Sequence, residues 1–341
     1  MRACKQARAR ASEVVQPLHP MRALLRSCTP ALLIALAACG GGPSDGLAVD
    51  LDKSNEDVLL RYYLGGYVGP GGGDPASAGL MVEEGGLAVR PEAAPEPYRD
   101  ALRDVNGDGT LDWDEFVAFV EATYARARGL PPTLDALRAE APYAEGDSAW
   151  FVTEVEGSPM TTARRRIYVP VAALREGLAG YRAAGDRLLY PEGTVIVGEH
   201  REGERVLETT VKRRRADGFW DFAVYGADGR LAGATATPPR PLRTPIQCTG
   251  CHLGRRLFDP EKTFPAPAPD GPHGPRAVVV DDAVRAAVEA HDLAMRFDEH
   301  AKRSDGVLGL YGTLYVARLL ADREAGRLAP EDAALLEALG L

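Results

Sequence analysis

Two cysteines three positions apart, Cys248 and Cys251, are followed directly by His252 in the run Cys-Thr-Gly-Cys-His. This pattern is the attachment signature of a c-type haem. Each thiol would form a thioether with a haem vinyl group, and the imidazole would bind the iron as its proximal ligand. The sequence therefore predicts a single covalently attached haem c at this motif.

Half of a zinc site, a redox dithiol and a chance match are the alternatives. A zinc site needs four ligands, usually with a second pair at short spacing, yet the only cysteines after residue 39 are Cys248 and Cys251. A thioredoxin-like dithiol belongs at the strand-to-helix turn of a βαβ unit, whereas this motif follows a Pro-rich run at 238–241. Both observations favour haem attachment.

A second group of chemically capable residues lies at 104–115 and carries oxygen donors at regular spacing. The calcium loop of an EF-hand supplies oxygens from positions 1, 3, 5, 7, 9 and 12 and has glycine at position 6, where Gly109 stands. The predicted calcium ligands are Asp104, Asn106, Asp108, Thr110 through its backbone carbonyl, Asp112 and Glu115.

Helices at 97–103 and 113–128 are expected to flank this loop. The alternative is an Asp/Asn/Gly-rich turn that holds no ion. The stretch from Asp50 begins like another calcium loop, but Arg61 stands at its twelfth position. A lone EF-hand has no coupled partner, so we expect the calcium to be structural rather than a sensor input.

The N-terminal region reads as an export signal. A basic segment beginning at Met21 precedes an apolar run, 30–38, that is too short to span a bilayer. The run ends Leu-Ala-Ala before Cys39, which resembles the lipobox of bacterial lipoproteins, and Cys39 would then carry the lipid. A cleavable signal without lipid is the alternative. We expect a protein of the bacterial cell envelope that faces the periplasm. A lipid on Cys39 would anchor it, with the outer membrane as the expected location, and this anchor would be its contact with the membrane.

The formal net charge of −9 argues against a nucleic-acid partner. Stretches rich in Gly, Pro and Ser divide the chain, and the spacing of apolar residues changes from a helical period to the alternation of strands. The expected parts are a signal peptide at 1–38, a tether and N-terminal segment at 39–92, a helical EF-hand segment at 93–145, a haem domain at 150–265 and a C-terminal helical segment at 277–341.

The fold class predicted from these patterns is α+β, with a β-rich antiparallel-sheet haem domain between two helical segments. Strands are expected at 150–155, 164–169, 194–197, 206–212 and 219–225, and helices at 56–68, 171–181, 282–303, 308–325 and 330–339. On the helix at 282–303, His291 and Met295 share the apolar stripe and are candidates for a sixth iron ligand. A packing methionine and a hydrogen-bonded histidine are the plainer interpretation.

Several of these strands resemble the cytochrome P-460 family, which includes cytochrome c′-beta. The matching residues cover about 150–265 and form blocks at 166–169, 190–199, 220–222 and 228–229 ahead of the haem motif. The resemblance implies a β-rich haem domain with five-coordinate iron and an open distal side. Members of that family oxidise hydroxylamine or bind nitric oxide and similar ligands.

One departure from the family bears on activity. In its hydroxylamine-oxidising members, a lysine on the Thr-Val-x-Val-Lys-Glu strand is cross-linked to the porphyrin, and Gly198 stands at that position here. We therefore expect a haem protein that binds a diatomic or N-oxide ligand. An electron-transfer cytochrome with six-coordinate iron and a periplasmic redox partner is the alternative, and a hydroxylamine-oxidising enzyme is disfavoured by Gly198. No catalytic residue is assigned.

Overall fold

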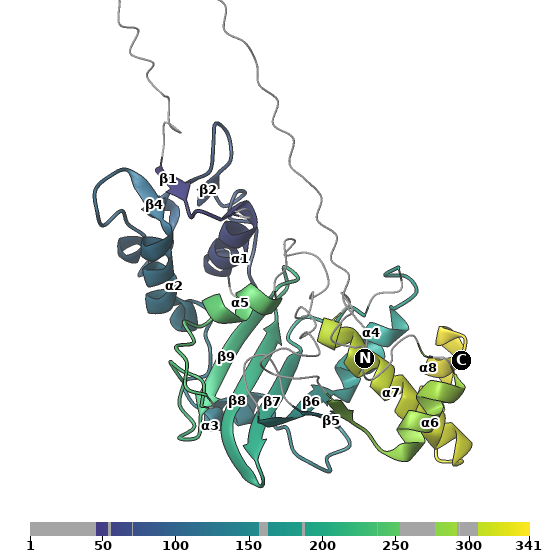
Figure 1. The fold of residues 1–341 in the computed structure, drawn as a ribbon. Helices are drawn as coiled ribbons and strands as arrows, with labels where there is room; N and C mark the ends of the chain where they lie inside the picture. The colour runs from purple at the N-terminus through teal and green to yellow at the C-terminus, as the bar shows by residue number, and fades with distance from the viewer. Residues whose placement is uncertain are drawn as a thin grey trace, which may run out of the picture. The chain divides into compact units, whose positions relative to one another are not determined.

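The computed structural model describes a chain of the α+β class, as the sequence predicts (Figure 1). Cys39 and Met295 lie outside the described residues, so the lipid anchor and one candidate iron ligand have no structural counterpart here. The described residues are 46–53, 56–69, 71–156, 163–185, 188–236, 238–252, 277–291, 293 and 306–341.

A six-stranded sheet with the order β10-β5-β6-β7-β8-β9 is the main structural layer, and every neighbouring pair in it is antiparallel. The strands at 150–225 are confirmed, although β7 and β8 are longer than expected because their hairpin extends the pairing to Glu202 and Arg205. Its strands are β5 (Trp150–Glu156), β6 (Arg164–Pro170), β7 (Val195–Glu202), β8 (Arg205–Arg214), β9 (Trp220–Gly226) and β10 (Ala277–Val279).

Both faces of this sheet are buried. Alternate residues of a strand point to opposite faces, so Ile196 of β7 joins the larger hydrophobic core while its neighbour Val197 joins the smaller one. The smaller core is covered by helix α3 (Leu134–Glu140), which contributes Leu137. The larger core brings the sheet together with helices from both ends of the chain.

A second, four-stranded sheet has the order β2-β3-β1-β4, and its β1 and β4 are parallel. The Gly-, Ser- and Pro-rich composition of residues 40–49 predicts a flexible tether, and this prediction is wrong from Leu47 onward. Residues 48–50 pair with the end of the predicted calcium loop, and Leu47 pairs with β3, which satisfies backbone groups of this run. The strands are β1 (Leu47–Asp50), β2 (Met81–Val82), β3 (Ala88–Val89) and β4 (Thr110–Asp112).

Two helices next to this sheet carry much of the larger core. Helix α1 (Glu56–Val68) matches its expected bounds, and α2 (Trp113–Ala127) matches the expected helix after the calcium loop. The helix expected at 97–103 is wrong, because only the 3₁₀ turn Arg99–Ala101 forms there, with another at Pro91–Ala93. Pro95 and Pro97 just before it lack the N–H groups that a longer helix would use.

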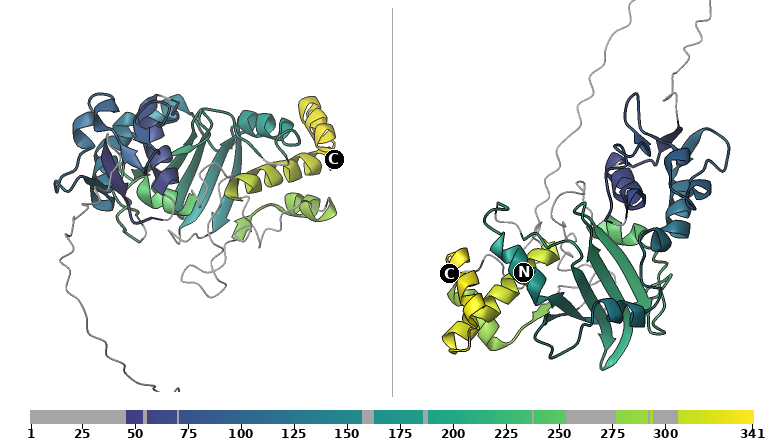
Figure 2. Two further views of the ribbon diagram at one scale, coloured as in Figure 1. Left: turned by 90° about the horizontal axis from the view of Figure 1, so that it is seen from above. Right: turned by 180° about the vertical axis from the view of Figure 1, so that it is seen from behind.

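Four helices accompany the β5 side of the large sheet (Figure 2). There Phe151 of β5 packs edge-on against Tyr315 of α7. The helix predicted at 282–303 is wrong in length, since it ends at Ala290 with His291 as its C-cap. The helices are α4 (Val171–Ala179), α6 (Asp282–Ala290), α7 (Gly306–Glu324) and α8 (Pro330–Leu339). None of the helices in the described ranges is long and apolar enough to cross a membrane.

Candidate functional site

The Cys-Thr-Gly-Cys-His motif lies entirely on the short helix α5 (Ile246–His252), which follows Pro245. Residues three apart on a helix are neighbours on its surface. Cys248 and Cys251 are therefore about one helical turn apart along the backbone of α5, with His252 next along the chain. This is the spacing at which the attachment motif carries its two cysteines.

The first cysteine of the motif, Cys248, is partly buried. Together with Ile246, Cys248 packs against the larger hydrophobic core, which also holds Trp220 and Phe222 of β9. A haem edge is a large apolar surface that needs such surroundings. The helical setting and the apolar contact both suit a covalently bound haem.

Between the two cysteines, the buried Thr249 is fixed by two hydrogen bonds. Its hydroxyl donates to the carbonyl oxygen of Ile246 at 2.9 Å and lies 2.7 Å from the hydroxyl of Tyr63 on α1. Since the one Thr249 proton serves Ile246, Tyr63 donates to Thr249. Burial raises the pKa of Tyr63 despite this hydrogen bond, so the phenol keeps the proton it donates.

The loop at 104–115 has the backbone that a calcium loop requires. Gly109, at the sixth position, has φ of 83°, a conformation that glycine adopts without strain. Asp104 accepts the amides of Gly107 and Gly109, both at 2.6 Å, and Glu115 accepts that of Val105, also at 2.6 Å. The first and last predicted ligands therefore both turn onto the same short stretch of loop backbone.

Asp112 and Glu115 also form a capping box at the start of α2, each side chain accepting the amide of the other. In the described part of the chain, no three His, Cys, Asp or Glu side chains gather as a ready-made metal cluster. The donor types and the loop backbone suit calcium. In this structure the side chains of Asp104 and Glu115 accept hydrogen bonds from loop amides and do not converge on one point.

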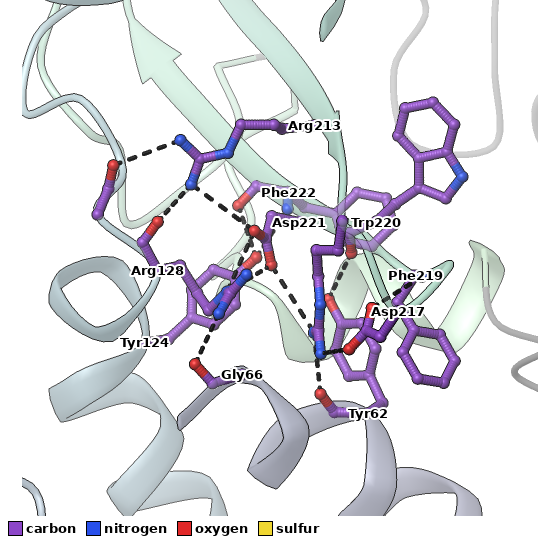
Figure 3. Close-up of polar contacts among 12 residues, drawn as sticks. Tyr62, Gly66, Tyr124, Arg128, Arg213, Asp217, Phe219, Trp220, Asp221 and Phe222 are labelled. Atoms are coloured by element: carbon purple, nitrogen blue, oxygen red, sulfur yellow. Dashed lines mark hydrogen bonds and ion pairs between the residues drawn. The ribbon is translucent and has the colours of Figure 1, made fainter. Parts of the chain in front are cut away.

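A buried ionic network joins this segment to the large sheet (Figure 3). Arg128, just after α2, donates from Nε to both carboxylate oxygens of Asp221 on β9, at 2.9 and 3.1 Å, and from Nη1 to the carbonyl oxygen of Gly66 on α1 at 2.6 Å. The Arg128 and Asp221 side chains are 2% and 1% exposed. Leaving either charge unpaired in such surroundings would cost several kcal/mol, roughly 3–5.

A second buried arginine lies on the other side of Asp221. Arg215 donates to the Tyr62 carbonyl oxygen at 3.0 Å, pairs with Asp217, and has Nη1 3.9 Å from Asp221 Oδ1. The hydroxyl of Tyr62 donates to the Trp220 carbonyl oxygen at 2.8 Å. Helices α1 and α2 are therefore fixed to the sheet by groups that cannot be separated without exposing buried charge.

A row of titratable side chains crosses the sheet near the turn between β7 and β8, with His200 and Glu208 buried and Arg165 partly buried. Arg165, His200 and Glu208 are direct cross-strand partners, and His200 Nδ1 lies 3.0 Å from Glu208 Oε1. Burial lowers the pKa of His200, although Glu208 opposes the shift. Burial alone would raise the pKa of Glu208, but the hydrogen bonds from His200 and the Ala236 amide lower it.

Sequence reasoning missed this row and the network around Asp221. The hairpin turn at 203–204 places Arg201 opposite Val206, but a β-bulge between His200 and Arg201 shifts the register so that His200 lies opposite Glu208. The turn alone therefore could not predict this pair. No local sequence pattern predicts the contact between Arg128 and Asp221, which are 93 positions apart.

Two other residues singled out in the sequence, His291 and Gly198, lie at the end of α6 and on β7. The ring of His291 is partly exposed, with Nε2 3.4 Å from Glu324 Oε1, so the expectation that it faces the core is wrong. Gly198 lies in the middle of β7, where a Cβ would come 2.8 Å from Thr210 Oγ1 and 3.1 Å from Ile167 Cδ1. The strand is therefore packed closely at the position where the resembled family carries its cross-linking lysine.

Comparison of the chain with protein-family models, curated proteins and solved structures finds no match.

Proposed function

We propose that this protein is an exported, lipid-anchored cytochrome with one c-type haem, which binds a small ligand such as nitric oxide or an N-oxide. Cys248 and Cys251 would hold the haem, and His252 would bind its iron. The observation that carries the proposal is the placement of the complete motif on α5, with Cys248 packed against the apolar core of the sheet.

The residues around α5 suit the holding of a large apolar group more than they suit metal capture. Thr249 and Tyr63 fix the helix between the two cysteines, and Trp220 and Phe222 contribute apolar surface to the same core. Bound there, the iron would supply reversible binding of small ligands at its free axial position. His252 would orient it from the other side.

Gly198 supports ligand binding over hydroxylamine oxidation. It has no amine for a porphyrin cross-link, and Thr210 and Ile167 leave little room for a side chain there. His291, a candidate sixth ligand, has its ring nitrogen beside Glu324. Both observations support an iron whose distal position stays open. The calcium site at 104–115 would then be structural, fixing α2 and β4 at their shared end.

The absorption spectrum of the ferrous protein tests this proposal. We expect high-spin iron that takes up CO or nitric oxide rapidly. A low-spin spectrum with slow ligand uptake would contradict the open site and support an electron-transfer cytochrome with a periplasmic redox partner. A strongly red-shifted Soret band, typical of a cross-linked haem, would contradict the role assigned to Gly198 and support the hydroxylamine-oxidising alternative.

A further inference from the structure

We propose that calcium bound at 104–115 stabilises the haem-attachment helix α5 through a chain of contacts that runs from Phe116 to Tyr63 to Thr249. Tyr63 is then a positioning residue for the haem motif. This inference rests on the proposed haem function and adds calcium as a stabiliser of the same site.

The chain of contacts begins at the calcium loop itself. Glu115 is the twelfth position of the loop and also lies in the first turn of α2, where its side chain closes the capping box with Asp112. Phe116 is the next residue and is fully buried. A ligand that fixes Glu115 therefore fixes the backbone that carries Phe116.

The next contacts lead from Phe116 into the haem motif. The ring of Phe116 meets that of Tyr63 edge-on, with centroids 5.4 Å apart. The Tyr63 hydroxyl bonds Thr249, whose own proton is used by the Ile246 carbonyl oxygen. A shift of Phe116 therefore acts on a buried hydrogen bond, and a buried polar group that loses its partner is costly.

The other end of α2 is held in place. Arg128 is bonded to Asp221 of β9 and to Gly66 of α1, so α2 is anchored where it ends. Loosening of the calcium loop then falls mainly on the first turn of α2, which is the turn that contacts Tyr63. Coupling between two binding sites is reciprocal, so haem attachment should also tighten calcium binding.

Amide hydrogen exchange of the full haem-bearing protein, in calcium and after removal of calcium by a chelator, tests this coupling. We expect exchange at 246–252 to slow by about tenfold in calcium, a typical size for coupling between sites. Tyr63→Phe keeps the ring against Phe116 but removes the hydroxyl, and Thr249→Val removes the acceptor. Both variants should lose most of the calcium effect at 246–252 while keeping it at 104–120.

Tyr67→Phe is the matched control. Tyr67 is on the same helix and is also buried, and its hydroxyl lies 2.5 Å from Thr123 Oγ1, which donates to the Phe119 carbonyl oxygen. Tyr67 therefore makes the same kind of tyrosine–threonine hydrogen bond as Tyr63, but its threonine lies on α2 and not on α5. Tyr67→Phe should therefore keep the calcium effect on 246–252.

The outcomes separate the two proposals when a haem stain is run on the same samples. A sample without covalent haem contradicts the proposed function, and this inference falls with it. Haem-bearing protein whose exchange at 246–252 is the same with and without calcium contradicts the coupling alone. An undiminished calcium effect in Tyr63→Phe, or an equal loss in Tyr67→Phe, contradicts the route through Tyr63.

Discussion

The hydroxyl of Tyr63 lies 2.7 Å from the hydroxyl of Thr249, which stands between the two cysteines of the haem-attachment motif. The two residues are 186 positions apart, and they connect α1 to the helix that would carry the haem. Tyr63 also meets Phe116 of α2, the helix that follows the predicted calcium loop, so α1 lies between that loop and the motif.

Substitution of calcium ligands should separate ion binding from haem attachment. Asp104→Ala and Glu115→Gln each remove a charged oxygen ligand, so calorimetry should show tight calcium binding lost while the haem stain persists. Asp114→Asn is the control, because Asp114 is an exposed acidic residue of the same loop at a position that supplies no ligand. Calcium uptake equal to wild type in both ligand variants would refute the assignment.

Neutralisation of the buried aspartate should destabilise the whole protein. Asp221→Asn leaves Arg128 and Arg215 without their shared carboxylate in a buried setting, at a cost of about 3–5 kcal/mol in the free energy of unfolding. Glu204→Gln makes the same charge change at a side chain that is 99% exposed, and should shift stability by less than about 0.5 kcal/mol. Urea unfolding measures both, and similar values for the two variants would show that the network carries no stability.

Stability should fall with decreasing pH because of His200. Burial lowers the pKa of this residue, with Arg165 adding to the shift and Glu208 opposing it, so His200 stays neutral in the folded state. The unfolded chain takes up the proton below about pH 6.5. The contribution of neutral His200 to the free energy of unfolding is therefore fully present above that pH and is lost as the pH falls below it.

Unfolding free energies at about pH 7.5 and about pH 5.5 test this dependence, with a slope of at most about 1.4 kcal/mol per pH unit from one residue. His200→Gln cannot take up the proton and should flatten the slope. The lowered pKa of Glu208 acts in the same direction but below this range. An unchanged slope in the variant would show that another group is responsible.

Replacement of the two candidate sixth ligands should leave the iron unchanged. The partly exposed His291 pairs with Glu324, so His291→Ala should cost less than about 1 kcal/mol. Met295→Leu is nearly isosteric and should also cost little. Absorption spectra of both variants should match wild type. Conversion of a low-spin wild-type spectrum to high-spin by either change would establish a sixth ligand.

The elements that the sequence predicts well are those with strong local signals. Helix α8 begins at Pro330 and ends before Gly340, the residue types that start and stop a helix, and its predicted bounds match the structure. The hairpin of β7 and β8 follows from alternating apolar residues around a turn. The α+β class and the strands β5 to β9 were predictable in the same way, whereas β10 was not predicted, because its residues were assigned to the C-terminal helical segment.

The features that could not be predicted from the sequence depend on contacts between segments far apart in the chain. Strand β1 is only four residues long and looks like part of a Gly-rich tether until β4 pairs with it some sixty residues later. Arg128 and Asp221 each look like ordinary surface charges in the sequence, and only the packing of α2 on β9 buries them together. For the candidate site, both motifs could be found from spacing, whereas Tyr63, which connects them, could not.

The covalent attachment of haem is the central claim, and the denatured full-length protein tests it most directly. Wild-type chain, unfolded and run on a denaturing gel, should retain a haem stain, because thioether bonds to Cys248 and Cys251 survive unfolding. The double variant Cys248→Ala and Cys251→Ala should lose the stain, since no other cysteine follows residue 39. A denatured wild-type chain without haem, expressed with the c-type attachment machinery, would contradict the account.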